Sequence, residues 1–152
     1  MATASSNEFQ LVVPETAQRT MILVGTEFSI PCHLSPEISA VDMEIRWFKE
    51  TDCVCIYKNR EIIEGRVFKG RVNLITEKLE KGDVSLSLKN FRESDRGDYV
   101  CQVTSGVKTE EITVTFSWAF GGFVWLMKEK VNRTWTENEK LKMEDSVLMA
   151  GE

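Results

Sequence analysis

The residues of this sequence with the most reactive side chains are four cysteines, Cys32, Cys53, Cys55 and Cys101, and a single histidine, His33. One histidine excludes a metal centre built from several histidines and argues against histidine-dependent catalysis. The cysteines form no C-x-x-C pair, so the sequence indicates neither a redox motif nor a zinc ribbon. Cys32 and Cys101 are far apart in the chain, which suits a disulfide that crosses the core and hence an oxidising compartment.

Cys53 and Cys55 are separated by one residue, and on an extended strand their side chains would face the same way. A disulfide between them would be strained and easily reduced. Their spacing leaves two states open, free thiols or some bond, with an interchain bond as one form of the latter. A metal site at this pair is not expected, because no further ligands lie nearby in the sequence.

Motifs of enzymes are missing from the sequence: there is no phosphate-binding glycine loop, no H-E-x-x-H and no G-x-S-x-G. His33 follows Cys32 and should therefore point away from the core. The tripeptide Arg96-Gly97-Asp98 matches a sequence known from integrin ligands, but we interpret it as part of a tight corner. We therefore expect no catalytic residue, no cofactor and no metal.

The length, charge and hydrophobic content describe one acidic globular domain. The 152 residues include 19 Lys and Arg against 24 Asp and Glu, a formal charge of −5. This balance argues against nucleic acid or an anionic membrane surface as the main partner, because both attract clustered positive charge. Hydrophobic residues make up 42% of the chain and charged residues 28%, as in a folded domain rather than a disordered one.

The elements that must position these residues are strands, because apolar side chains recur at every second position. Turn-forming segments separate the runs, which predicts an all-β fold of two antiparallel sheets packed face to face. The clearest strand predictions are 27–34, 43–48, 84–89 and 111–116. Weaker predictions are an interrupted edge strand at 9–13 and 20–23, a hairpin of 54–58 and 61–64, and a strand at 71–76.

Four residues, two from these runs and two from the segment that ends at Cys101, form a recognisable constellation in the core. Cys32 and Trp47 share the inward face of neighbouring strands, and Tyr99 points the same way as Cys101. A disulfide between Cys32 and Cys101 would join the two sheets, with Trp47 packed against it. The Tyr99 hydroxyl would reach back to the backbone at the corner.

The segment before Cys101 supplies the rest of the pattern, a glycine and an acidic residue at fixed spacing. Gly97 lies in the turn, and Asp95 is expected to form a bidentate ion pair with Arg71 at the start of another strand. The full pattern, Cys32…Trp47…Asp95-x-Gly97-x-Tyr99-x-Cys101, resembles the immunoglobulin variable-type fold. The resemblance covers residues 9–116, which we take as the domain, and leaves 117–152 as an apolar segment and a charged tail outside it.

Several further motifs resemble the first domain of butyrophilins and myelin oligodendrocyte glycoprotein. They are Met43-Glu44-Ile45-Arg46-Trp47-Phe48, Tyr57-Lys58-Asn59-Arg60, Gly70-Arg71-Val72 and Lys81-Gly82-Asp83-Val84-Ser85-Leu86. This family consists of cell-surface proteins related to T-cell costimulatory ligands. The resemblance implies receptor binding by an exposed sheet face, with modulation of T-cell receptor signalling and cytokine production.

The partner-binding face is expected on the sheet that carries Arg46, Phe48, Tyr57 and Gln102, interpreted as outward polar and aromatic groups. The expected partner is a protein receptor on another cell, a T cell by the resemblance. The alternatives are an antigen-receptor-like variable chain and a cell-adhesion domain. The first of these expects a Phe/Trp-Gly-x-Gly bulge, which the segment 105–110 does not contain.

The C-terminal segment consists of an uncharged apolar run followed by a charged stretch. Phe116–Met127 is an uncharged run of about 12 residues, short of the roughly 20 that a spanning helix needs. It is expected to be an exposed apolar tail or partner patch, with weak membrane contact as the alternative. Residues 128–152 are expected to form a loose tail or marginal helix, and Asn132 heads a glycosylation sequon. No secretory signal is visible, yet the disulfide places the chain outside the plasma membrane or in secreted form.

Overall fold

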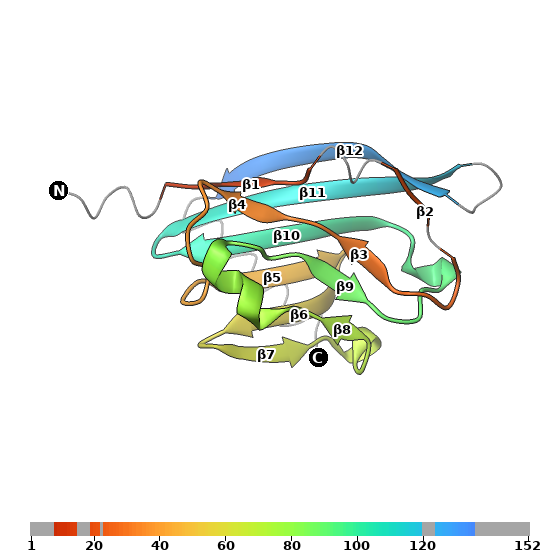
Figure 1. Ribbon diagram of the computed structural model, residues 1–152, viewed down its shortest axis with the longest axis horizontal. Coiled ribbons are helices and arrows are strands. Elements are labelled where there is room, and N and C mark those ends of the chain that lie inside the picture. The colour runs from red at the N-terminus through yellow and green to blue at the C-terminus, as the bar shows by residue number, and fades with distance from the viewer. Residues whose placement is uncertain (1–7, 15–18, 22, 120–123, 136–152) are drawn as a thin grey trace.

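The computed structural model describes residues 8–14, 19–21, 23–119 and 124–135, and these residues form two packed layers of antiparallel strands (Figure 1). The larger sheet contains, in spatial order, β2 (Arg19–Met21), β12 (Val124–Trp135), β11 (Lys108–Ala119), β10 (Asp98–Ser105), β5 (Glu44–Lys49), β6 (Asp52–Lys58) and β7 (Glu61–Glu64). The facing layer contains β3 (Phe28–Ile30), β9 (Leu86–Leu88) and β8 (Val72–Asn73), with the pair β1 (Gln10–Val12) and β4 (His33–Ser35) beside them. Short 3-10 helices join these strands: η3 (Arg66–Phe68), η4 (Thr76–Lys81) and η5 (Glu93–Asp95). The predicted sandwich of two antiparallel sheets is confirmed.

The core lies between the layers, because every second side chain of the facing strands points inward. Trp47 is fully buried, and its indole nitrogen donates a hydrogen bond to the carbonyl oxygen of Val84 at 2.9 Å. This bond leaves no buried polar atom of the indole without a partner. The other large buried side chains are Tyr99, Phe28, Phe91, Ile30, Leu34, Ile45, Leu79, Leu86, Leu88 and Ile112.

The run 27–34, expected as one strand, is divided into β3 and β4. Pro31 has no N–H to donate to a ladder, which explains the break. The N–H of Cys32 donates instead to the Ser85 hydroxyl at 3.0 Å. The backbone still follows the neighbouring segment, since Val84 N–H donates to the Cys32 carbonyl at 2.9 Å.

The hairpin predicted from 54–58 and 61–64 is present as β6 and β7. Asn59 and Arg60 join the strands with φ of 53° and 63°. Two successive residues with positive φ define a type I′ turn, whose twist matches that of the strands it connects. The hairpin places β7 at the outer end of the large sheet.

The C-terminal segment differs from its prediction as an apolar run followed by a loose tail or marginal helix. β11 continues to Ala119, and β12 pairs with it antiparallel over nearly its whole length, from Thr109↔Trp135 to Ala119↔Val124. Alternating β-branched and aromatic residues on both sides of Gly121-Gly122 are typical of two strands joined by a turn. The prediction was wrong because charged residues at 128–133 hid this alternation. Residues 136–152 of the expected tail lie outside the described residues.

Candidate protein-binding face

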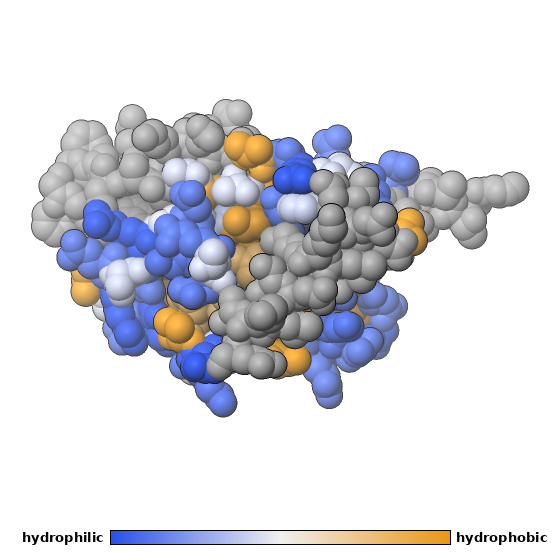
Figure 2. All heavy atoms as spheres, turned by 180° about the vertical axis from the view of Figure 1, so that it is seen from behind, coloured by the Kyte–Doolittle hydropathy of each residue, from blue (hydrophilic) through white to orange (hydrophobic). Residues whose placement is uncertain are grey.

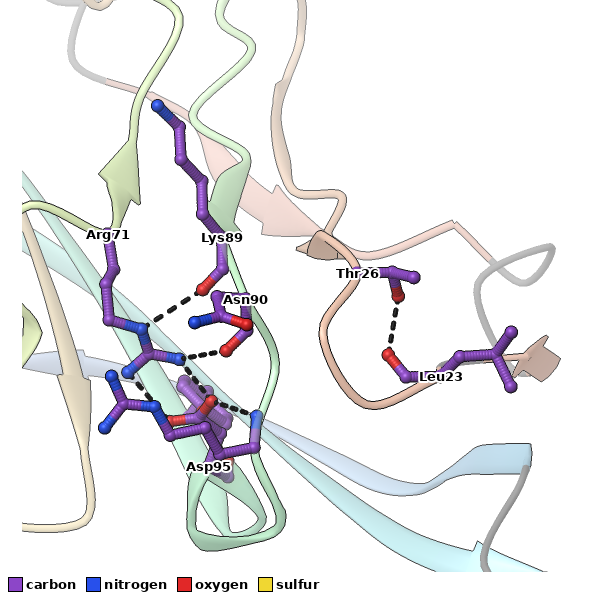
Figure 3. A network of polar contacts seen from close by, with 8 residues as sticks. Leu23, Thr26, Arg71, Lys89, Asn90 and Asp95 are labelled. Atoms are coloured by element: carbon purple, nitrogen blue, oxygen red, sulfur yellow. Dashed lines mark hydrogen bonds and ion pairs between the residues drawn. The ribbon is translucent and has the colours of Figure 1, made fainter.

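The structure brings Arg71, Asp95 and Tyr99 together at one corner of the sandwich. Figure 3 shows Arg71 directed at Asp95 there. Arg71 donates to both carboxylate oxygens of Asp95, with Nη1 3.2 Å from Oδ1, and the two side chains are only 10% and 4% exposed. The remaining Arg71 donors reach the carbonyl oxygens of Lys89 at 3.1 Å and Asn90 at 3.2 Å. A buried ion pair whose spare donors are also satisfied is costly to break.

The same corner holds the hydroxyl of Tyr99 and the turn at Gly97. The Tyr99 hydroxyl donates to the carbonyl oxygen of Asp95. Burial, and then the Asp95 charge, raises the pKa of Tyr99 well above its usual value, so the hydroxyl remains a donor at any physiological pH. Gly97 has φ of 148°, a conformation that favours glycine.

Cys32 and Cys101 lie together in the core, as the sequence predicts for a cross-sheet pair. Both are buried thiols in the structure, and a side-chain hydrogen bond links them. Burial, and then this hydrogen bond, raises the pKa of Cys101. The contact supports the predicted disulfide, and the covalent bond stays a prediction for the oxidised protein.

Cys53 and Cys55 do not face the same way, contrary to the prediction. The register between β5 and β6 shifts after Trp47, so that Trp47 lies opposite Cys55 while Phe48 lies opposite Cys53. This extra residue in β6 turns Cys55 into the core and leaves Cys53 on the outer face, half-buried. Both cysteines are thiols in the structure, and opposite orientations disfavour a bond between them.

The four residues expected to form the binding face, Arg46, Phe48, Tyr57 and Gln102, are all buried. Tyr57 lies opposite Ile45 and so points into the core, where its hydroxyl donates to the carbonyl oxygen of Val41 at 2.6 Å. The other three lie on the outer face, where Phe48 is only 2% exposed and the polar groups of Arg46 and Gln102 are engaged. Arg46 pairs with Glu44, and Gln102 Nε2 donates to Glu111 Oε1 at 2.7 Å. This set of residues is therefore wrong as an exposed contact surface.

β12 adds side chains to the same outer face that the sequence did not identify. Arg133 lies opposite Glu111, which lies opposite Gln102, so these residues form one row across three strands. Glu111 Oε1 also accepts a hydrogen bond from the Trp135 indole at 2.7 Å. The Arg133 guanidinium carbon stacks 3.7 Å from the centre of the Trp135 ring. Val131, two residues before Arg133 and on the same face, is 51% exposed.

These contacts hold an arginine and a tryptophan in place at the surface, and an exposed valine lies on the same face. We call Val131, Arg133 and Trp135 the β12 patch. Arg133 is exposed and Trp135 half-buried, so both present atoms to solvent, while Glu111 anchors Trp135 and Arg133 stacks on its ring. Arginine and tryptophan are enriched among residues that dominate protein–protein binding energies. In the sequence, only the alternation of side chains along 131–135, typical of a strand, could have indicated this patch.

The surface seen from behind the sandwich is mixed in character. Figure 2 shows hydrophobic residues scattered among hydrophilic ones where the residues are described, without one continuous hydrophobic patch. Non-obligate protein contact surfaces have this mixed composition, whereas permanent interfaces are more apolar.

His33 lies where the sequence predicted, directed away from the core. It lines an open polar hollow of about 510 Å³ together with Glu37, Glu77, Lys78, Lys81 and Asp83. No serine or cysteine is among these described lining residues. Within the described ranges there is also no group of three or more His, Cys, Asp or Glu that could hold a metal ion.

Asn132 is exposed on β12, and its side-chain Nδ2 donates to the Leu11 carbonyl oxygen at 3.0 Å. It lies opposite Ile112, and so on the other side of the sheet from the β12 patch. In the part of the chain that the structure describes, no helix is long and apolar enough to cross a membrane. The side chains of 116–119 and 124–130 lie outside the described residues, which leaves the predicted membrane contact of 116–127 as a prediction.

Comparison with known proteins agrees with this architecture. The family model of the immunoglobulin V-set domain matches residues 15–117. The chain therefore belongs to the immunoglobulin V-set family. It is a butyrophilin-like V-type domain, as the sequence motifs suggested.

The relatives and solved structures give the extent of this similarity. Butyrophilin-like protein 1 of Mus musculus is 35% identical over 104 residues, which are 64% of this chain and 20% of that protein. Butyrophilin subfamily 1 member A1 of Bos taurus is 31% identical over 114 residues, 72% of this chain and 21% of that protein. The chain thus spans about a fifth of the length of these relatives.

Two solved structures share the fold. The crystal structure of bovine butyrophilin matches with a TM-score of 0.57 at 19% identity, over 84% of this chain and 85% of that one. The human B7-H4 IgV-like domain matches with a TM-score of 0.50 at 22% identity, over 78% of this chain and 92% of that one. β12 lies wholly beyond the residues matched by the V-set family model.

Proposed function

We propose that this chain is a cell-surface or secreted binding module that engages a protein receptor on immune cells. In this proposal the contact modulates T-cell receptor signalling and cytokine production, and requires no catalysis. The observation that carries the proposal is the β12 patch, in which Glu111 holds Trp135 on the outer sheet face and Arg133 stacks on the Trp135 ring. The relationship to butyrophilin-like proteins supports the choice of immune cells.

The patch suits binding because its side chains are ordered before a partner arrives. Trp135 has its indole N–H bonded to Glu111, and Arg133 has its guanidinium group over the ring. Such preorganisation lowers the entropy lost on association. Val131, on the same face, adds exposed apolar surface to the patch.

The experiment measures staining of T cells by fluorescent tetramers of the chain. We expect Arg133→Glu and Val131→Asp to weaken staining by about tenfold or more, the usual effect of losing a dominant contact residue. Val24→Asp is the matched control, since Val24 is 71% exposed on the loop before β3. The control should stain like wild type, and all three variants should melt like wild type.

Two results would contradict the proposal. If the wild-type tetramer stained no immune cell, the receptor-binding function would be wrong. If it stained T cells and the two patch variants stained equally well, the face would be wrong. The signalling part is tested by immobilising the chain beside T cells stimulated through their antigen receptor, where secreted cytokine should change relative to wells carrying Arg133→Glu.

A further inference from the structure

β7 forms an open edge of the large sheet. It pairs with β6 on one side only, and among the described residues no strand pairs with its outer edge. An open edge presents unpaired backbone N–H and C=O groups that can template another extended chain. Proteins that avoid such pairing use short strands and charged side chains at their edges.

The turn before β7 determines which backbone groups face outward. In a hairpin with a two-residue type I′ turn, the residues flanking the turn exchange hydrogen bonds, and the pattern then alternates. Lys58↔Glu61 and Ile56↔Ile63 are thus the bonded pairs, and Tyr57↔Ile62 and Cys55↔Glu64 the non-bonded ones. The N–H and C=O groups of Ile62 and Glu64 therefore point away from β6, towards the open edge.

The side chains of β7 combine exposed apolar and acidic character. Ile63 is 61% exposed and Ile62 is 37% exposed, on opposite faces of the strand. Glu61 and Glu64 bracket them, and Glu61 is exposed. The edge therefore offers two aliphatic contacts between two negative charges.

A second copy of this chain fits this edge poorly. Antiparallel pairing of two β7 strands about a two-fold axis, through the outward groups of Ile62 and Glu64, would place Ile62 of one copy opposite Glu64 of the other and Glu61 opposite Gly65. Neither glutamate would then lie opposite a positive charge. A partner strand with basic residues opposite the two glutamates would instead form opposite-charge pairs.

From these features we infer that the outer edge of β7 is a strand-addition site for an extended protein segment in which two aliphatic residues are bracketed by lysine or arginine. The segment adds as an antiparallel strand through the backbone of Ile62 and Glu64. Its basic side chains pair with Glu61 and Glu64. This site is separate from the β12 patch and does not rest on the function proposed for that patch.

The test uses a blocked synthetic peptide, Thr-Lys-Val-Val-Lys-Thr, and an acidic control, Thr-Glu-Val-Val-Glu-Thr. Amide hydrogen exchange is measured by NMR on the whole chain with each peptide. We expect the basic peptide to slow exchange at Ile62 and Glu64, while Ile63, already bonded to β6, changes little. The acidic peptide should leave all three amides unchanged.

Charge reversal at the edge supplies the matched variant. Glu61→Lys should weaken the basic peptide by about two- to fivefold and allow the acidic peptide to bind. Glu64 is left intact because its Oε1 accepts a hydrogen bond from the Gly70 N–H at 2.7 Å. Ile62→Pro should abolish binding by removing an outward donor, whereas Ile62→Val should retain it.

Three outcomes would overturn the inference. One is a basic peptide that binds without protecting Ile62 and Glu64. Another is equal binding of both peptides to wild type. The third is no binding of the basic peptide to a chain whose melting temperature shows it folded. None of these results bears on staining by the β12 patch variants, so the two proposals fail separately.

Discussion

The hydroxyl of Tyr99 donates its hydrogen bond to the backbone carbonyl of Asp95, a residue four positions earlier in the chain. The carboxylate of the same Asp95 accepts from Arg71 and, at 2.8 Å, from the Arg92 N–H. One aspartate thus joins a turn, a strand of the large sheet and the start of β8. The corner is a stability element, and it lies at a distance in sequence from the β12 patch.

Arg71→Ala should lower the free energy of unfolding by about 3–5 kcal/mol, because it leaves the Asp95 carboxylate buried without its cation. Arg71→Lys should recover only part of this, since lysine cannot form a bidentate pair. Arg60→Ala is the control, because the Arg60–Asp42 pair at 3.0 Å is well exposed. Removing it should cost less than about 1 kcal/mol. Urea unfolding measures all three, and equal losses at 71 and 60 would refute this role of the corner.

The natively secreted chain should contain a Cys32–Cys101 disulfide, because the two thiols are in contact in the core. Cys32→Ser should then lower stability by about 4 kcal/mol in the chain-entropy model and impair secretion. Peptide mapping without reductant identifies the linked pair. Alkylation of both thiols in folded secreted material would show that the bridge is absent.

The free energy of unfolding should fall in alkaline solution, because the Cys55 thiol ionises more readily in the unfolded chain than in the folded one. Burial, and then the nearby Cys53 and Glu64, raises the pKa of the Cys55 thiol from 9.0 to about 12. The unfolded chain therefore loses this proton first, so stability present below pH 9 is lost as the pH rises towards 12. The slope approaches about 1.4 kcal/mol per pH unit. Cys55→Ala should flatten this part of the stability curve, and identical slopes in both proteins would contradict the assignment.

Asn132 should carry a glycan when the chain is secreted from mammalian cells. The residue is exposed, and a glycosylated amide keeps one N–H for the Leu11 carbonyl. Asn132→Gln should remove a glycosidase-sensitive mobility shift. Thr134→Ser is the control, since it keeps both the sequon and the hydroxyl that bonds Glu110 at 2.8 Å. A wild-type chain insensitive to glycosidase would refute the prediction.

The sequence predicted the sandwich because its strands alternate strictly and its corner residues fall at fixed spacings. The positions of Trp47, Tyr99 and the Arg71–Asp95 pair could be predicted, because they follow from the local sequence pattern and from contacts common to this fold. The orientation of Tyr57 could not be predicted in this way. It depends on the register of β6 against β5. A single extra residue in β6 puts Cys53 and Cys55 on opposite faces of the sheet.

The binding face was mispredicted for a second reason, which concerns its neighbours. Alternation correctly placed Arg46 and Gln102 on the outer face, but it cannot say which polar groups are engaged there by adjacent strands. Glu111 bonds Gln102 and Trp135 together, and Trp135 belongs to a strand that the sequence did not predict. A face built across strands far apart in the chain is a tertiary property.

The proposed binding face depends most on β12, since it exists only if residues 131–135 form a strand of the large sheet. Amide hydrogen exchange of the free chain tests this directly. We predict slow exchange at those amides of 131–135 that point towards β11, comparable with their partners on β11. Exchange at the rate of an unstructured peptide throughout 131–135 would contradict the account and remove the β12 patch as a binding surface.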